Sequence, residues 1–95
     1  MIRKIHKFVI TELYQQEFLV PIGSVVRHVG KDSRSENPAV WLEFDAVLEH
    51  QLEPRTFGYV GTGWSIADDH QIYLGAAHTQ DHNSQLIWHV YEVIK

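Results

Sequence analysis

The chain has 95 residues, which is enough for one compact unit only, so we predict a single domain over residues 1–95. Hydrophobic residues make up 44% of it and aromatic residues 12%, a composition that supports a packed core and excludes a disordered protein. Cysteine is absent, which excludes disulfides and thiolate sites. No apolar run approaches the ~18 residues of a membrane span. The formal net charge of −4 argues against nucleic acid as a partner. We therefore expect a soluble protein with neither a membrane nor a nucleic-acid partner.

Short segments rich in β-branched and aromatic residues recur between turn signals, and none keeps a helical period for three turns. The clearest alternation places Val40, Leu42 and Phe44 on one face of a strand. The expected strands cover residues 6–11, 17–20, 24–29, 39–45, 55–60, 71–78 and 86–94. This pattern predicts an all-β fold, a small antiparallel sandwich or partly open barrel of about seven strands.

The connections between these strands carry their own signals. Pro21 and Gly23 predict a tight reversal. Residues 30–38 are polar and lack an apolar side chain to bury, so we expect an exposed, mobile and dispensable loop. Asp45 is a suitable cap for one or two helical turns within residues 46–54. TQDHNSQ, residues 79–85, predicts a hairpin loop.

The last strand is apolar on both of its faces. Leu86, Trp88 and Val90 lie on one face, and Ile87 and Tyr91 lie on the other. Such a strand is central in a sandwich or lies at a subunit interface, because a bare apolar edge invites aggregation. We expect a homo-oligomer.

Two glycines bracket a threonine at Gly61, Thr62 and Gly63, and Trp64 follows. Glycines permit close backbone approach, so this GTG turn can aim amide groups at a phosphate or carboxylate, while the indole offers a stacking surface. The longer glycine pattern of a dinucleotide fingerprint and the lysine of a P-loop are both missing. The alternative is a simple glycine-enabled bend at a strand end.

Other residues extend this candidate ligand site. A guanidinium binds phosphate and an indole stacks on a base, so a pocket for an anionic, ring-bearing ligand is predicted from Arg55, Thr56, Trp41, Trp64 and His28. His89 stands in the apolar last strand, where it is either a hydrogen-bonded core histidine or, if it opens onto a cleft, a ligand contact.

Metal binding and catalysis have weaker signals. His78 and His82 are four residues apart, but they straddle a strand end and a loop, where that spacing does not converge on one ion. Asp68, Asp69 and His70 are expected to be solvated turn residues. No serine lies in a nucleophile elbow. We assign no catalytic residue, metal or cofactor.

Several segments together resemble an uncharacterised family of small bacteriophage-encoded proteins: KFVI, VPIGSVV, AVWLEFD, RTFGYVGTGWSI and the closing IWHVYEV. The likeness covers nearly the whole chain and includes a GTG turn and a terminal strand of the WHVFE kind. It marks Gly61, Thr62, Gly63, His89 and Glu92, together with residues 55–57, as matching the family pattern. The chain departs from that pattern in the loop after Gly30 and in residues 78–84. The resemblance implies a phage origin and action in the host cytoplasm, and it implies no reaction.

Three functions follow as hypotheses. The first is a phage accessory protein that inhibits bacterial immunity by sequestering a nucleotide-derived signal at the GTG turn, Arg55, a tryptophan and His89. The second is a protein inhibitor of a host defence enzyme, or a virion accessory component, without a small ligand. The third is a phosphodiester hydrolase that depends on His89.

Overall fold

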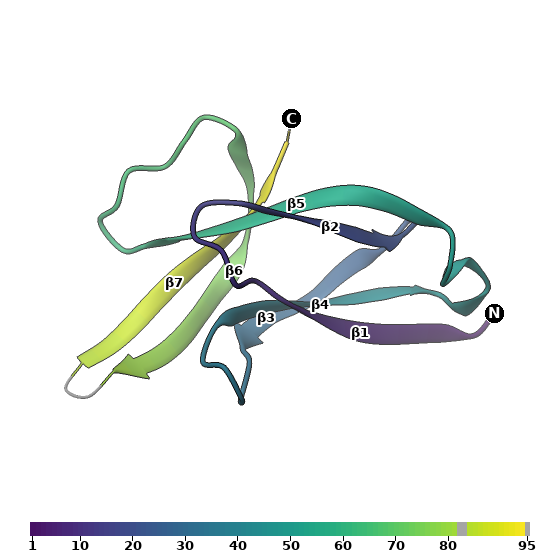
Figure 1. Ribbon diagram of the computed structural model, residues 1–95, viewed down its shortest axis with the longest axis horizontal. Coiled ribbons are helices and arrows are strands. Elements are labelled where there is room, and N and C mark those ends of the chain that lie inside the picture. Colours follow the sequence, from purple (N-terminus) through teal and green to yellow (C-terminus); the bar gives the residue numbers. More distant parts are fainter. Residues whose placement is uncertain (82–83, 95) are drawn as a thin grey trace.

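The computed structural model describes residues 1–81 and 84–94. In this part of the chain seven strands form two antiparallel sheets that do not close into a barrel (Figure 1). The prediction of an all-β fold of about seven strands is confirmed. One sheet has the order β1-β4-β3 and the other the order β2-β5-β7-β6. The strands are β1 (Arg3–Val9), β2 (Gln16–Pro21), β3 (Val25–Lys31), β4 (Pro38–Asp45), β5 (Leu52–Gly61), β6 (His70–Asp81) and β7 (Ser84–Val93).

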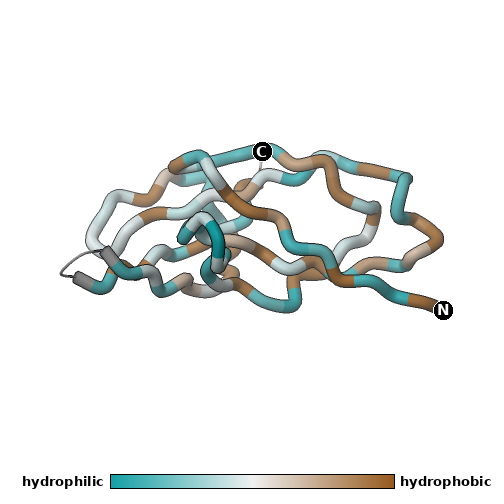
Figure 2. The backbone as a smooth tube through the Cα atoms, turned by 60° about the horizontal axis from the view of Figure 1, so that its bottom comes forward, coloured by the Kyte–Doolittle hydropathy of each residue, from teal (hydrophilic) through white to brown (hydrophobic). Residues whose placement is uncertain are grey.

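The two sheets enclose a small apolar core. Hydrophobic and hydrophilic residues alternate along much of the chain, and the molecule is flat, with extents of 45 × 29 × 17 Å (Figure 2). Val40 and Leu42 of β4 pack with Phe57 and Tyr59 of β5, as the period-two pattern predicts. Each fully buried side chain of this size contributes about 2 kcal/mol to folding. The core therefore joins the two sheets through their central strands.

Two connections form as expected. The amide of Ser24 donates to the carbonyl of Pro21 at 3.2 Å, and Gly23 takes a positive φ of 78°, which makes the predicted reversal. The carboxylate of Asp45 accepts from the amide of Val47 at 3.0 Å and caps the 3-10 helix η1 (Ala46–Leu48). None of the described residues belongs to a helix that is long and apolar enough to cross a membrane.

Most of the loop after β3 is exposed, as expected, with Asp32 as an exception. Asp32 is only 4% exposed. Its carboxylate accepts hydrogen bonds from the amide and hydroxyl of Ser35 and from the ammonium group of Lys7 on β1. These contacts hold the pKa of Asp32 well below its usual range, with the Lys7 hydrogen bond as the largest cause. The loop thus tethers itself to β1 through a buried carboxylate.

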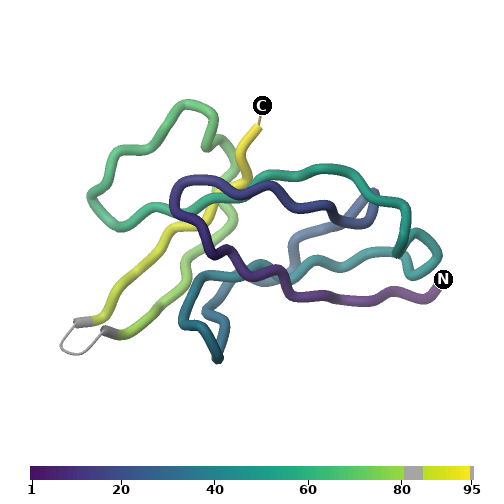
Figure 3. Tube along the Cα trace, in the orientation of Figure 1, coloured from purple at the N-terminus to yellow at the C-terminus, as the bar shows by residue number. Residues whose placement is uncertain are grey.

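β7 is a central strand, flanked by β5 and β6. Along β7, Val90 and Val93 are buried, whereas Leu86 and Ile87 are both 37% exposed. β5 leaves β7 at the pair Gly61 and Trp88, and the chain then runs out in a wide loop, residues 62–69, before it returns as β6 (Figure 3). Residues 82 and 83, which belong to the predicted hairpin loop, lie outside the described residues.

Candidate functional site

The GTG turn ends the pairing of β5 with β7. The amide of Trp64 donates to the carbonyl of Gly61 at 3.1 Å, and Gly63 has a positive φ of 87°. A Cβ atom on Gly61 would lie 2.8 Å from Cε2 of Trp64, so glycine lets the indole fold back against the turn. No atom lies within 4 Å of the Cβ position of Gly63, which leaves that backbone open to a ligand.

His89 connects this turn to the rest of the sheet. Its Nε2 atom lies 2.9 Å from the hydroxyl oxygen of Thr62, and its Nδ1 atom lies 3.1 Å from the hydroxyl oxygen of Tyr73 on β6. A hydroxyl both donates and accepts, so the two partners satisfy either tautomer of the imidazole. Tyr73 in turn packs edge-on against Tyr91, with ring centroids 5.3 Å apart. The turn and the histidine, which are far apart in sequence, therefore meet in one place.

A shallow cavity of about 250 Å³ opens at this meeting point, and we name it the GTG cavity. Its lining combines the glycines and Thr62 with aromatic and aliphatic side chains. Its lining residues are Val60, Gly61, Thr62, Gly63, Trp64, Ile66, His89 and Tyr91. None of these described residues is acidic, so the lining does not repel an anion.

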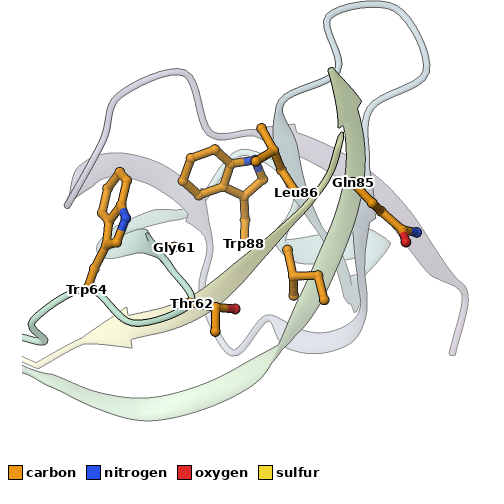
Figure 4. Close-up of a pocket in the computed structure, with 7 residues that line it drawn as sticks. Gly61, Thr62, Trp64, Gln85, Leu86 and Trp88 are labelled. Carbon is orange, nitrogen blue, oxygen red and sulfur yellow. The ribbon is translucent and has the colours of Figure 1, made fainter. Parts of the chain in front are cut away.

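A second concavity, of about 310 Å³, lies where β5 has left β7, and we name it the β7-edge groove. It is lined by Gly61, Thr62, Trp64, Gln85, Leu86, Ile87 and Trp88. Figure 4 shows the indoles of Trp64 and Trp88 beside one another, the first carried by the turn and the second by β7. Their ring centroids are 5.4 Å apart in an edge-to-face arrangement. Trp64 is thus a wall shared by both concavities.

Arg55 lies outside both concavities. Its guanidinium donates two hydrogen bonds of 2.8 Å to the carboxylate of Glu92 and a third to the carbonyl of Ser24. The hydrogen bonds to Glu92 raise the pKa of Arg55 above its ordinary value. Thr56 is 6% exposed and, with Arg55, borders a different hollow on the far part of β5. The structure does not bring these two residues to the GTG turn.

Trp41 is also distant from the turn, because it belongs to β4 in the other sheet. Its ring packs against His28 of β3, with centroids 4.9 Å apart. Among the residues predicted for the ligand site, those that the structure gathers are Gly61, Thr62, Gly63, Trp64 and His89, and those that it places elsewhere are Arg55, Thr56, Trp41 and His28.

Sequence reasoning missed Tyr73, Tyr91 and Ile66. Tyr73 and Tyr91 are directly opposed on β6 and β7. Tyr91 and His89 are two residues apart on β7, so the alternation of the strand predicts that they share a face. On β6 a bulge between Tyr73 and Gly75 interrupts the alternation, so the sequence does not predict the face of Tyr73. Ile66 lies in the loop, where no periodicity applies.

His70, expected to be a solvated turn residue, is buried. Its Nε2 atom donates to the carbonyl of Tyr14 at 2.7 Å, and its Nδ1 atom lies 3.1 Å from the carboxylate of Asp69. Across residues 1–81 and 84–94, no three His, Cys, Asp or Glu side chains gather as a metal site would require. His82, which was weighed as a ligand, lies outside the described residues.

A family model described as a domain of unknown function, DUF7352, matches residues 1–95. The chain belongs to DUF7352. Comparisons of this DUF7352 chain with curated proteins and with solved structures found no match.

The chemistry of the DUF7352 site follows from its donors and faces. The hydroxyl of Thr62 and the open backbone of Gly63 are hydrogen-bonding groups for an anionic or carbonyl oxygen, and His89, whose two ring nitrogens contact Thr62 and Tyr73, orients that hydroxyl. Trp64 and Tyr91 present aromatic rings to a planar group. The site combines hydrogen-bonding groups with aromatic surfaces for stacking.

Proposed function

We propose that this protein binds a nucleotide-like small molecule in the GTG cavity and sequesters it. The observation that carries the proposal is the 2.9 Å contact between Thr62 and His89, which brings the glycine turn and the imidazole into one concavity beside two aromatic rings. Ligand sites commonly combine a mostly apolar lining with a few convergent polar groups. This cavity has that composition.

The volume of the GTG cavity and the charges near it limit the kinds of ligand that can bind. The volume of about 250 Å³ lies just below the range of ~300–1,000 Å³ usual for whole drug-sized ligands, so the cavity accommodates one base or one ribose-phosphate unit. Because Arg55 is paired with Glu92, an anion would be held by the hydroxyl of Thr62 and the backbone of Gly63, with His89 orienting that hydroxyl. We therefore expect a ligand with one ring against the aromatic side chains and a phosphate at Thr62 and Gly63.

The biological setting is part of the same proposal. The resemblance to small bacteriophage proteins supports a phage accessory protein that acts in the host cytoplasm, where capture of a nucleotide-derived immune signal would counter a bacterial defence. A homo-oligomer stays a prediction.

Isothermal titration against cyclic nucleotides, cyclic dinucleotides and ADP-ribose tests the proposal. We expect one of these ligands to bind, and Thr62→Val to weaken that binding about fivefold, since one hydrogen bond is worth roughly 1 kcal/mol. Thr11→Val, in an exposed loop distant in sequence from the turn, is the matched control and should bind normally. Flat titrations for every ligand, or equal weakening by both variants, contradict the proposal.

One observation favours a second candidate, the phosphodiester hydrolase. Thr62, His89 and Tyr73 form a hydrogen-bonded chain. In a hydrolase, Thr62 would be the nucleophile, His89 the base and Tyr73 the group that orients the base. Incubation of the bound ligand followed by chromatography separates the candidates. Intact ligand supports sequestration, whereas hydrolysis that His89→Ala abolishes, with folding preserved, supports the enzyme.

The alternative of a protein inhibitor or virion component also has structural support. Ile72, Tyr73 and Leu86 are exposed hydrophobic residues on β6 and β7. A purified host enzyme that loses activity at a stoichiometric amount of this protein, with no small ligand bound, would favour that function.

A further inference from the structure

We infer that the β7-edge groove is a docking site for an extended, uncharged peptide segment of a partner protein, which adds to the sheet as a strand beside β7. This inference is independent of the proposed ligand in the GTG cavity. It depends on the backbone of Gln85–Ile87, on the two indoles that flank it and on the charge of the lining.

The first observation is an open strand edge. β7 pairs with β6 along its whole length, but its pairing with β5 ends at Trp88 and Gly61. Among the described residues, no strand pairs with the other side of Gln85, Leu86 and Ile87. In an antiparallel sheet, alternate residues present both N–H and C=O to the same neighbour, so this edge offers unsatisfied hydrogen-bonding groups. An added strand would occupy the place that β5 vacates at the GTG turn.

The second observation is that residues 85–87 lack the features that usually keep an exposed strand edge from pairing with another strand. Natural edges are blunted by lysine, proline or bulges. Gln85, Leu86 and Ile87 include no charge and no proline, and their pairing with β6 is regular. Leu86 and Ile87 are both 37% exposed. The edge is therefore competent for pairing.

The third observation selects the occupant. Trp64 and Trp88 form an apolar end to the groove, and none of the described lining residues carries a charge. The groove therefore matches an uncharged strand that places one bulky apolar side chain against the indoles, which is β-strand addition with a side-chain pocket for specificity. A second copy of this chain fits less well. Three paired residues span only ~10 Å, and a stable interface buries about 800 Å² on each partner.

The probe is an acetylated and amidated heptapeptide in which threonine alternates with valine and leucine occupies the centre. Titration into the full-length protein, followed by amide and indole NMR shifts, should give a saturable site at Gln85–Ile87, Trp64 and Trp88. N-methylation of the peptide edge should weaken binding at least tenfold, because it removes backbone donors. Replacement of the central leucine by lysine should weaken it similarly.

Two protein variants complete the test. Leu86→Lys places a charge in the groove and should abolish the shifts, whereas Ile72→Lys alters a residue of comparable exposure outside the groove and should leave them intact. Circular dichroism checks that both variants fold. The inference is overturned if no heptapeptide with leucine, phenylalanine or tryptophan at its centre binds, if the N-methylated peptide binds equally well, or if light scattering shows a dimer that Leu86→Lys dissociates. Because Leu86 does not line the GTG cavity, nucleotide titration of the same variant reports separately on the proposed function.

Discussion

The imidazole of His70 lies 2.7 Å from the carbonyl oxygen of Tyr14, and both groups rest on the backbone of Gly58. A carbonyl only accepts, so Nε2 of the ring carries the proton in this contact. The start of β6 is thereby tied to the β1–β2 connection across the surface of β5. The hydrogen bond between His70 and Tyr14 therefore anchors the C-terminal end of the loop 62–69, which carries Trp64 and Ile66.

Gly58→Ala should destabilise the protein by about 3 kcal/mol or more. An added Cβ atom would lie 1.5 Å from the Tyr14 carbonyl oxygen, and backbone cannot move as easily as the end of a side chain. Urea unfolding measures the change. The control is Gly63→Ala, which meets no atom within 4 Å and should lose only the roughly 1 kcal/mol that a positive φ costs. Equal losses in both variants would contradict the role of the Tyr14 contact.

Asp32 should make stability depend on pH in the acid range. Lys7 and Ser35 hold the pKa of the folded carboxyl far below its usual value, so the unfolded chain takes up the proton first as the pH falls. The stabilisation is complete above about pH 5 and is lost progressively below it. Asp32→Asn should therefore be less stable than the parent protein near neutral pH, and the difference should shrink on acidification. Urea unfolding at several pH values measures it, with Glu36→Gln, from an exposed ion pair, as the control.

Some parts of this structure could be predicted from the local sequence and others could not. The alternation in β4 and the reversal at Gly23 were predictable because residues a few positions apart determine them. The burial of Asp32 depends on Lys7, 25 residues away, and nothing in the polar loop itself indicates that partner. Within the site, glycine chemistry predicted the turn at residues 61–63, whereas the contact of Thr62 with His89 required the register between β5 and β7.

Arg55→Met should lower stability by about 2 kcal/mol and leave ligand binding in the GTG cavity unchanged. The substitution leaves the half-buried carboxylate of Glu92 without its two guanidinium donors. The double variant Arg55→Met with Glu92→Met should recover much of the loss, because removing both partners avoids an unpaired charge. Urea unfolding of the four proteins forms a double-mutant cycle. Loss of nucleotide binding in the single variant would instead return Arg55 to the ligand site.

Gly61→Ala should perturb both concavities at once. Its Cβ atom would lie 2.8 Å from the indole of Trp64, which is the end of a side chain and can swing away from Trp88. We expect a stability loss of only about 1 kcal/mol, since the indole yields more easily than backbone, together with loss of the exciton signal that the two coupled indoles give in circular dichroism. Trp41→Phe is the control, because the third tryptophan lies in the other sheet and should not affect that signal. An unchanged couplet in Gly61→Ala would mean that the glycine at position 61 does not determine where Trp64 lies.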